Sequence, residues 1–280
     1  MKIGLVLEGG AMRGLYTAGV LDVFLDKDIK VTDILGVSAG AVFGVNYKSN
    51  QRGRTLRYNL KYLNDKRYMS INSLIKTGNL VNKEFAYYTL PRELDIFDEK
   101  TYEDNNINFY AVITNMETGK PEYVEIDNAE EKIEVLRASS SMPFLSKPVL
   151  INNNSYLDGG ISDSIPVLKA MEMGCDKVIV VLTRPIEYRK KKRNSFLIKM
   201  FYKKYPNLIN TMVNRYKNYN NTVEEIIKLE EEGKIFVIRP SRLVDIKRVE
   251  KDPKKLQEMY DLGVSDTISR IEELKNYLRS

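Results

Sequence analysis

The stretch Val31–Tyr47 reads VTDILGVSAGAVFGVNY, and it indicates the fold more clearly than any other part of the chain. Its first seven residues form a β-forming apolar run, and its last seven repeat apolar residues at helical spacing. The junction is a G-x-S-x-G sequence, whose glycines permit a strained backbone that lifts a serine hydroxyl out of the sheet edge. The pattern predicts a nucleophilic Ser38 between Gly36 and Gly40, and a glycine-rich turn with an N-cap serine is the simpler alternative.

The residues before this stretch repeat the same order of elements. Lys2–Leu7 is an apolar β-forming run, and apolar residues then recur at helical spacing from Leu15 to about Lys27. Strand, helix, strand and helix in succession predict an α/β fold, in which a mainly parallel central sheet lies between covering helices as a three-layer sandwich.

The loop after the first strand, EGGAMRG at residues 8–14, is rich in small residues whose backbone N–H groups can converge on an anion. Its glycine spacing fits a phosphate-binding P-loop, but Leu15-Tyr16 follow where Lys-Ser/Thr is needed. A dinucleotide-binding loop is also disfavoured, because Ala11 holds the position of the middle glycine. An oxyanion hole made by the N–H groups of Gly10 and Ala11, beside the serine, is the better interpretation.

The composition of the 280 residues excludes several kinds of site. The chain has no histidine, so a Ser-His-Asp or Cys-His site cannot form within it. The one cysteine, Cys175, excludes an intrachain disulfide and an ordinary Cys/His zinc site, and we expect no metal and no cofactor. A nucleophilic serine must therefore find its base among carboxylates, lysines or tyrosines.

The sequence Asp158-Gly159-Gly160 offers such a base. Asp-Gly is common turn chemistry, so a simple turn is the plain interpretation. However, the aspartate follows the predicted strand Ser155–Leu157, and in a chain without histidine a carboxylate at a strand end is well placed to serve Ser38.

Together the three motifs resemble the patatin-like phospholipase family. The G-G-x-x-R-G loop, G-x-S-x-G and D-G-G follow in the family's order, and Arg137–Pro143 (RASSSMP) also looks like the family, so the resemblance covers roughly residues 3–183. It implies a single patatin-like acyl hydrolase domain over residues 1–280, with cap segments at 50–105 and 184–222. By motif, the nucleophile is Ser38, its partner is Asp158, the oxyanion loop is Gly9, Gly10, Ala11, Met12, Arg13 and Gly14, and the elbow glycines are Gly36 and Gly40.

The resemblance implies a calcium-independent serine–aspartate dyad that cleaves acyl ester bonds of (phospho)lipids through an acyl-enzyme. An ordinary aspartate has a pKa of about 3.9, so we expect burial to raise the pKa of Asp158 toward a value suited to a base. Arg13 is expected to orient the loop rather than to bind lipid phosphate. Two alternatives stay open: a non-catalytic, membrane-associated regulatory protein with the same fold, and an esterase or thioesterase for small soluble acyl substrates.

Positive charge is concentrated in residues 184–204, which contain nine Lys/Arg and one acid. Since the whole chain carries +6, the remainder carries −2, and nucleic acid is not an expected partner. Residues 189–205 join this charge to apolar and aromatic side chains. Such a segment suits transient contact with an anionic membrane surface or a substrate lid, and a packed surface helix is the alternative.

Other elements follow from periodicity. If the segment after the basic run is one helix, one apolar face is formed by Leu197, Phe201, Tyr205 and Leu208. Leu256–Leu278 reads as a helical stretch broken near Gly263. No run approaches eighteen apolar residues and no signal peptide is visible, so we expect a cytoplasmic protein that is at most peripheral at a membrane.

Overall fold

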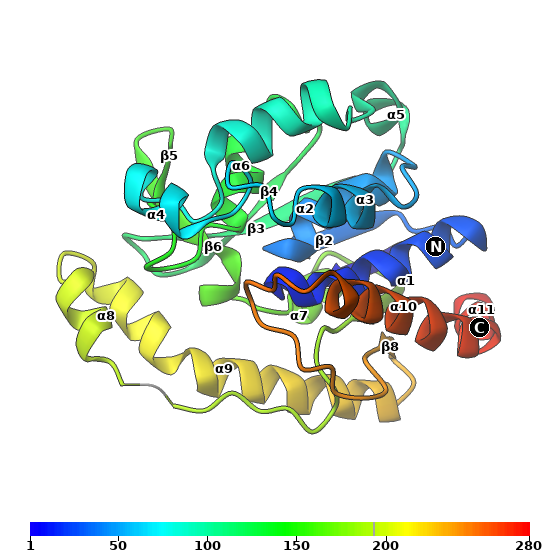
Figure 1. The fold of residues 1–280 in the computed structure, drawn as a ribbon. Helices are drawn as coiled ribbons and strands as arrows, with labels where there is room; N and C mark the ends of the chain where they lie inside the picture. Colours follow the sequence, from blue (N-terminus) through cyan, green and yellow to red (C-terminus); the bar gives the residue numbers. More distant parts are fainter. Residues whose placement is uncertain (193) are drawn as a thin grey trace.

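In the computed structural model, which describes residues 1–192 and 194–280, the apolar β-forming runs join into one central sheet (Figure 1). Its order is β5-β6-β3-β2-β1-β7-β8, with β4 added to β3. Strands β1, β2, β3, β7 and β8 are parallel, whereas β4 and β6 pair antiparallel with β3, and β5 pairs antiparallel with β6. The strands are β1 (Ile3–Leu7), β2 (Asp33–Val37), β3 (Asn108–Asn115), β4 (Pro121–Glu125), β5 (Val149–Ile151), β6 (Asn154–Asp158), β7 (Lys177–Val181) and β8 (Ile235–Ile238).

Helices cover both faces of this sheet, and short 3-10 turns (η1, η3) and a π-helical segment (η2) connect some of them. They are η1 (Ala11–Gly14), α1 (Leu15–Asp26), α2 (Ala39–Lys48), α3 (Arg54–Lys61), α4 (Ile71–Thr77), η2 (Phe85–Leu94), α5 (Glu99–Asp104), α6 (Ile133–Ser139), η3 (Gly159–Ile161), α7 (Val167–Glu172), α8 (Phe196–Phe201), α9 (Pro206–Glu231), α10 (Pro253–Ser269) and α11 (Ile271–Arg279). None of the described helices is long and apolar enough to cross a membrane.

Alternate residues of the strands enter two separate apolar cores. Leu5 and Leu7 pack with residues of α1, α2 and α10 on one face. Val6 of the same strand packs on the other face, where Val223 and Ile226 of α9 join residues of α7. A strand with apolar residues on both faces must be covered on both, so the three-layer α/β sandwich predicted from the sequence is confirmed.

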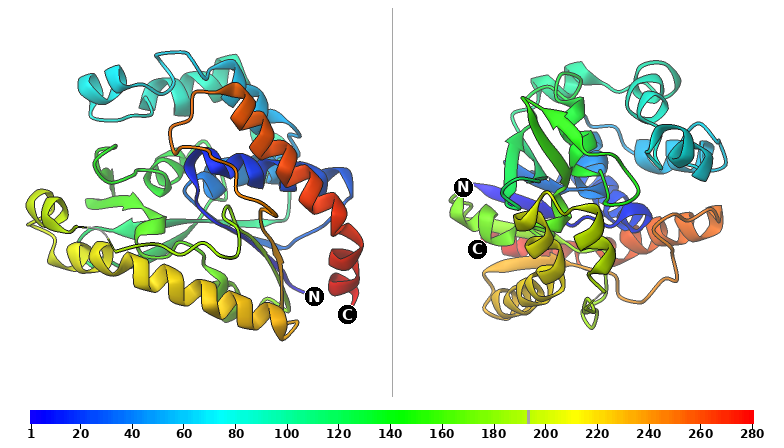
Figure 2. Two further views of the ribbon diagram at one scale, coloured as in Figure 1. Left: turned by 60° about the horizontal axis from the view of Figure 1, so that its bottom comes forward. Right: turned by 90° about the vertical axis from the view of Figure 1, so that its left-hand side faces the viewer.

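The segment between α2 and β3 lies on the opposite side of the molecule from the long helix α9 (Figures 1 and 2). It contains α3, α4, η2 and α5, and α3 packs against α1, α2 and α10. We call this segment, residues 50–105, the cap. Its aromatic residues form a layer of ring contacts, for example Tyr62 with Phe85 at a centroid distance of 5.4 Å.

Strand β3 extends beyond its neighbour β2, and this determines where two of the predicted site residues meet. The pairing of β2 with β3 ends with Val37 opposite Val112. Since β4 occupies the other edge of β3, β6 must continue along the same edge as β2, with Asp158 opposite Ile113. Strand β2 runs parallel and β6 antiparallel to β3, so their carboxyl ends face each other. The residues just after Val37 and at the end of β6 are therefore brought side by side.

The expectation of one helix that carries an apolar face from Leu197 to Leu208 is wrong. Helix α8 ends at Phe201, and α9 begins at Pro206. A residue before proline avoids helical geometry, whereas proline itself fits the first helical position. As a result Leu208 is buried while Leu197 and Phe201 are exposed, so the three do not share a face.

The predicted break near Gly263 is also wrong, since α10 continues through it to Ser269. A Cβ at Gly263 would lie 2.2 Å from the backbone oxygen of Tyr16, and one at Gly19 would lie 2.3 Å from that of Tyr260. The glycine is thus required by the close crossing of α1 and α10 and not by a turn.

Candidate active site

Ser38 stands at the turn between β2 and α2 in a strained backbone conformation, with φ 55° and ψ −119°. The flanking glycines keep φ negative, so the strained conformation is that of the serine itself. Their role is to allow close approach. A Cβ at Gly36 would lie 2.6 Å from Ala41 Cα, and one at Gly40 would lie 2.4 Å from the backbone oxygen of Leu7. The G-x-S-x-G spacing is therefore required by tight packing around a buried turn.

The structure brings Ser38 and Asp158 together, as the order of motifs predicted. Ser38 Oγ donates a hydrogen bond to Asp158 Oδ2 at 2.7 Å. Asp158 Oδ1 accepts from the backbone N–H of Gly160 at 2.8 Å, which fixes the carboxylate. Both side chains are buried, with 8% and 6% of their residue surfaces exposed. The first glycine of D-G-G is a packing requirement, because a Cβ at Gly159 would lie 2.1 Å from the backbone oxygen of Val112.

The surroundings of Asp158 change its affinity for a proton. Burial raises the pKa of Asp158, while the charge of Arg215, the hydrogen bond from Ser38 and the charge of Arg248 lower it. Burial prevails, so the pKa lies above the ordinary aspartate value, in the direction expected from the sequence. The raised pKa makes this carboxylate a better proton acceptor near neutral pH than a solvated one.

The loop at residues 9–14 packs against the serine turn. A Cβ at Gly9 would lie 2.9 Å from Ser38 Cβ, and one at Gly14 would lie 2.8 Å from Ala39 Cβ. Ala11 adopts a left-handed conformation with φ 49°, a region in which a Cβ is unfavourable. The loop thus reaches the serine closely only because its glycines carry no side chain.

The backbone N–H groups of this loop divide into two sets. The Arg13 N–H donates to Gly10 O at 3.2 Å, and the Met12 N–H donates to Arg248 O at 3.4 Å. Within the described part of the chain, no acceptor takes the N–H groups of Gly10, Ala11 or Ala39. These three N–H groups are therefore free to donate to an acceptor from outside the protein, as an oxyanion hole requires.

Glu8 holds the base of the loop from within the protein. Its Oε2 accepts from the N–H of Thr183 at 2.6 Å and from the Thr183 hydroxyl at 3.0 Å, and its Oε1 accepts from Tyr219 Oη at 2.9 Å. Glu8 is 3% exposed, and these hydrogen bonds satisfy a carboxylate that would otherwise be costly to bury. The network links β1, the end of β7 and α9 behind the loop.

Ser139 lies at the end of a helix next to the site, as the sequence indicates, and it makes a contact that sequence reasoning did not assign. Ser139 Oγ, at the end of α6, accepts a hydrogen bond from the backbone N–H of Ser38 at 3.0 Å, and Ser139 is fully buried. The next serine, Ser140, bonds Tyr87 Oη of the cap at 2.6 Å. The run Arg137–Pro143 had marked this region as similar to the family, but nothing in its spacing indicates a bond to the strained turn.

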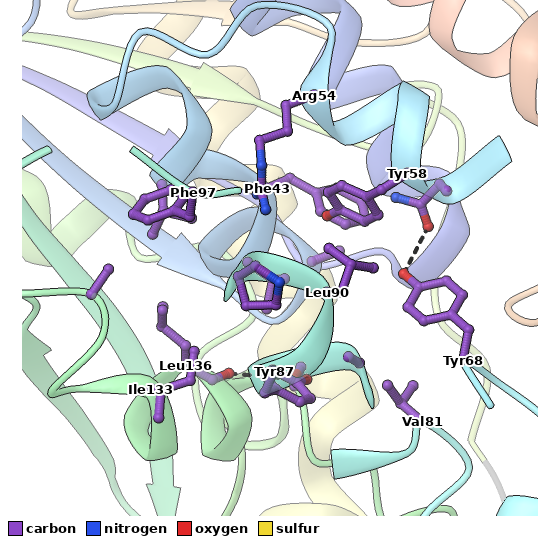
Figure 3. A pocket seen from close by; sticks show the side chains of 18 of the residues that line it. Phe43, Arg54, Tyr58, Tyr68, Val81, Tyr87, Leu90, Phe97, Ile133 and Leu136 are labelled. Atoms are coloured by element: carbon purple, nitrogen blue, oxygen red, sulfur yellow. Dashed lines mark hydrogen bonds between the residues drawn. The ribbon is translucent and has the colours of Figure 1, made fainter. Parts of the chain in front are cut away.

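Two cavities meet at Ser38. The first, which we call the cap cavity, has a volume of about 380 Å³ and is lined mainly by apolar side chains of the cap, α2 and α6. Figure 3 shows Phe43, Tyr58 and Leu90 around it, with the Arg54 side chain at one wall. Arg54 is neutralised there by Asp95, with an Nε–Oδ1 distance of 3.2 Å.

The second cavity, which we call the α9 cavity, has a volume of about 630 Å³ and lies between the loop at residues 9–14, α9 and the segment 184–198. Ser38 and Asp158 both line it, and its other walls carry many cationic side chains. Arg215 and Arg248 line the same cavity as Ser38 and Asp158, although both arginines lie far from the three motifs in sequence. Arg193, part of the basic run, lies outside the described residues.

Comparison with known proteins gives relatives that match about two thirds of the chain. The protein YjjU of Escherichia coli is 31% identical over 188 residues, which cover 66% of this chain and 52% of that protein. Lysophospholipase NTE1 of Kluyveromyces lactis is 29% identical over 187 residues, covering 64% of this chain and 12% of the enzyme. The chain therefore spans about half the length of the bacterial relative and about an eighth of the fungal one.

Among solved structures, VipD from Legionella pneumophila matches with a TM-score of 0.48 and 13% identity, over 97% of this chain and 67% of VipD. A family model described as a domain of unknown function matches residues 205–279. The model described as patatin-like phospholipase matches residues 5–171, more than half of the chain and all three motifs. The chain belongs to the patatin-like phospholipase family.

Proposed function

We propose that the chain is a serine acyl hydrolase that cleaves ester bonds of lipids by a Ser38–Asp158 dyad. The observation that carries this proposal is the 2.7 Å hydrogen bond from Ser38 Oγ to a buried carboxylate of raised pKa. Membership of a phospholipase family and the similarity to fungal enzymes named lysophospholipases support a lipid ester as the substrate. No histidine is present to take the part of the base.

In the proposed mechanism, Ser38 Oγ attacks the ester carbonyl carbon while its proton passes to Asp158 Oδ2. The N–H groups of Gly10, Ala11 and Ala39 stabilise the negative charge on the former carbonyl oxygen, and each such donor is typically worth about 3 kcal/mol. The bond to the alcohol then breaks, and the alcohol leaves with the proton held by Asp158. Water adds to the acyl-enzyme by the same route in reverse, which releases the fatty acid and returns the proton to Ser38.

The cap cavity supports a lipid rather than a small soluble ester. It opens at Ser38 and is walled by side chains such as Phe43, Tyr58 and Leu136 (Figure 3). An apolar cavity of about 150 Å³ accommodates benzene, so about 380 Å³ suits one acyl chain of moderate length. Each methylene buried there would contribute about 0.8 kcal/mol to binding.

Labelling with a fluorophosphonate probe tests the nucleophile. We expect the wild-type protein to be labelled and to release fatty acid from lysophospholipid, and Ser38→Ala to do neither. The matched control is Ser164→Ala, since Ser164 also lines the α9 cavity but bonds only Gly160 O and Lys190. A wild-type protein that is neither labelled nor active on any acyl ester would support the non-catalytic alternative.

The proposal includes peripheral contact with an anionic membrane through residues 189–205. Helix α8 exposes Phe196 and Phe201 to 67% and 64%, and Phe144 packs against Phe201 with a centroid distance of 5.6 Å. Lys199 is exposed on the same short helix. Exposed apolar side chains beside lysines suit insertion among lipid headgroups, next to the cavity that holds Ser38.

Vesicle sedimentation tests this contact. We expect Phe196→Ser with Phe201→Ser to weaken binding to phosphatidylglycerol vesicles by at least about tenfold, since each Phe loses about 1.5–3 kcal/mol of apolar burial. Ile268→Ser is the control, because Ile268 is also an exposed apolar residue but lies on α10. Equal binding by all three proteins would exclude α8 as the membrane contact.

A further inference from the structure

The α9 cavity is strongly cationic next to the dyad. Among the described residues that line it, Arg13, Arg184, Lys190, Arg215 and Arg248 lie around the site, and the acids are Glu8 and Asp158. Glu8 already accepts three hydrogen bonds inside the protein, and Asp158 is bonded to Ser38. Arg189, also on the wall, is paired with Glu224 and is not counted in this cluster.

The individual contacts place the charges close to the reacting atoms. The guanidinium of Arg215 lies against the D-G-G turn, because a Cβ at Gly160 would come within 3.1 Å of its Nη2. The Nζ of Lys190 lies 3.2 Å from the centre of the Tyr219 ring and 3.4 Å from Ser164 Oγ. Arg248 lines both cavities and is exposed, so its side chain reaches the junction at the serine.

These cations repel one another. Burial and the charges of Arg215 and Arg248 lower the pKa of Lys190 to about 6, so its amine is mostly neutral at pH 7 and takes up a proton when an anion binds beside it. Burial and Arg184 lower the pKa of Arg13 to about 10, so Arg13 stays charged. A positive potential that discourages further protonation favours the entry of an anion. Phosphate oxygens are the acceptors that arginine and lysine bind most strongly.

The position of the cluster defines which part of a substrate it meets. Ser38 lies at the junction of the two cavities, so an ester whose acyl chain occupies the cap cavity directs its alcohol into the α9 cavity. We propose that the α9 cavity is a binding site for a phosphate group on the leaving alcohol, built by Arg215, Arg248 and Lys190. This inference rests on the proposed function, because it needs the acyl group to be on Ser38.

The proposal gives a role to residues 205–279, which match a domain of unknown function. That segment supplies Arg215 from α9 and Arg248 from the loop before α10, and Tyr219 from α9 closes the wall behind Lys190. The patatin-like part holds the dyad, and the C-terminal part selects the alcohol. The preferred substrate is a single-chain lipid ester carrying phosphate, as in a lysophospholipid.

The test compares 1-decanoyl-glycerol 3-phosphate with 1-decanoyl-glycerol, both kept monomeric so that binding to a lipid surface plays no part. We expect the wild type to prefer the phosphate ester, and Arg248→Gln and Arg215→Gln each to lower kcat/KM for it about tenfold to a hundredfold relative to the neutral ester. Arg215 also affects the pKa of Asp158, and a change in that pKa alters kcat/KM for both substrates equally. The ratio of kcat/KM between the two substrates removes this shared effect. Lys217→Gln and Lys247→Gln, exposed neighbours outside the cavity, should leave the ratio unchanged.

Binding to Ser38→Ala separates this inference from the proposed function. Calorimetric titration of that variant with 1-decanoyl-glycerol 3-phosphate should show binding that Arg248→Gln in the same background weakens, whether or not the wild type turns over esters. The phosphate site would be overturned if Arg248→Gln and Arg215→Gln changed neither the kcat/KM ratio between the substrates nor the affinity for 1-decanoyl-glycerol 3-phosphate. If binding depends on the arginines but no ester is hydrolysed, the anion site stands and the hydrolase proposal falls. Inhibition by glycerol 3-phosphate but not by inorganic phosphate would assign the site to the lipid headgroup rather than to free phosphate.

Discussion

Replacing Asp158 by asparagine should affect catalysis and stability in opposite directions. The amide oxygen can keep the bond from Gly160 N–H, and the amide nitrogen can face Ser38 Oγ, so the two contacts of 2.8 Å and 2.7 Å survive without a group that can take a proton. A general base typically contributes about 10²–10⁴ in rate, so kcat on a lysophospholipid should fall by that factor. Steady-state assay of released fatty acid measures this loss.

Stability should rise because the pKa of Asp158 is higher in the folded than in the unfolded chain. Such a carboxyl is protonated in both states below its unfolded pKa of about 3.9, where wild type and Asp158→Asn should have equal Tm. As pH rises through the folded value, the wild type loses about 1.4 kcal/mol for each pKa unit of difference, whereas the variant does not. Each kcal/mol corresponds to about 2–4 °C in Tm, which calorimetry at pH 4 and pH 7 resolves.

Asp163→Asn is the matched control. Burial also raises the pKa of Asp163, which accepts hydrogen bonds from Tyr123 and Ile165 and does not bond Ser38. It should therefore gain stability at pH 7 with unchanged kcat. The reasoning would be refuted if Asp158→Asn kept more than about a tenth of wild-type kcat. A variant less stable than the wild type at pH 7, yet equal to it at pH 4, would refute the reasoning equally.

Three further outcomes are expected. The kcat/KM of the wild type should fall as the pH drops through the raised pKa of Asp158, at a higher pH than a solvated aspartate would give. A pH–rate profile measures this fall. If kcat/KM does not fall above about pH 4, Asp158 is not the general base. Ser139→Ala leaves the buried N–H of Ser38 unpaired, so urea unfolding should show a loss of about 1–3 kcal/mol together with a lower kcat, and an unchanged kcat would show that this bond does not position the turn. Ala11→Gly relieves a left-handed alanine, and the same unfolding experiment should show a gain of about 1 kcal/mol, whereas a loss would argue against strain at this loop.

The sequence allowed the N-terminal α/β pattern and the pairing of Ser38 with Asp158 to be predicted, because the strands and both turns carry local signals. Apolar periodicity marks the strands, and glycines mark the turns at Ser38 and Asp158 whose close approaches tolerate no side chain. The same glycine signal misled at Gly263, where the close partner is a distant helix rather than a turn. A glycine in the sequence shows that a side chain is not tolerated, but it does not show which element approaches it.

The contributors from distant segments could not be predicted. Ser139 bonds the strained turn across 101 residues, and Arg215 reaches the D-G-G turn only because α9 packs on the opposite face of the sheet from α1. Neither contact can be predicted from the spacing of residues in the sequence, because both depend on how whole helices pack against the sheet.

Under the proposed mechanism, the meeting of β2 and β6 end to end on β3 also determines when a nascent chain can become active. Ser38 and Asp158 are 120 residues apart, and at translation rates of about 5–20 residues per second the nucleophile waits roughly ten seconds for its base to be synthesised. The cationic side chains of α9 and the loop before α10 follow later still. If the proposed dyad holds, a growing chain on the ribosome passes through its early folding with an inert serine, and Ser38 gains its base only after β2 and β6 have both joined β3.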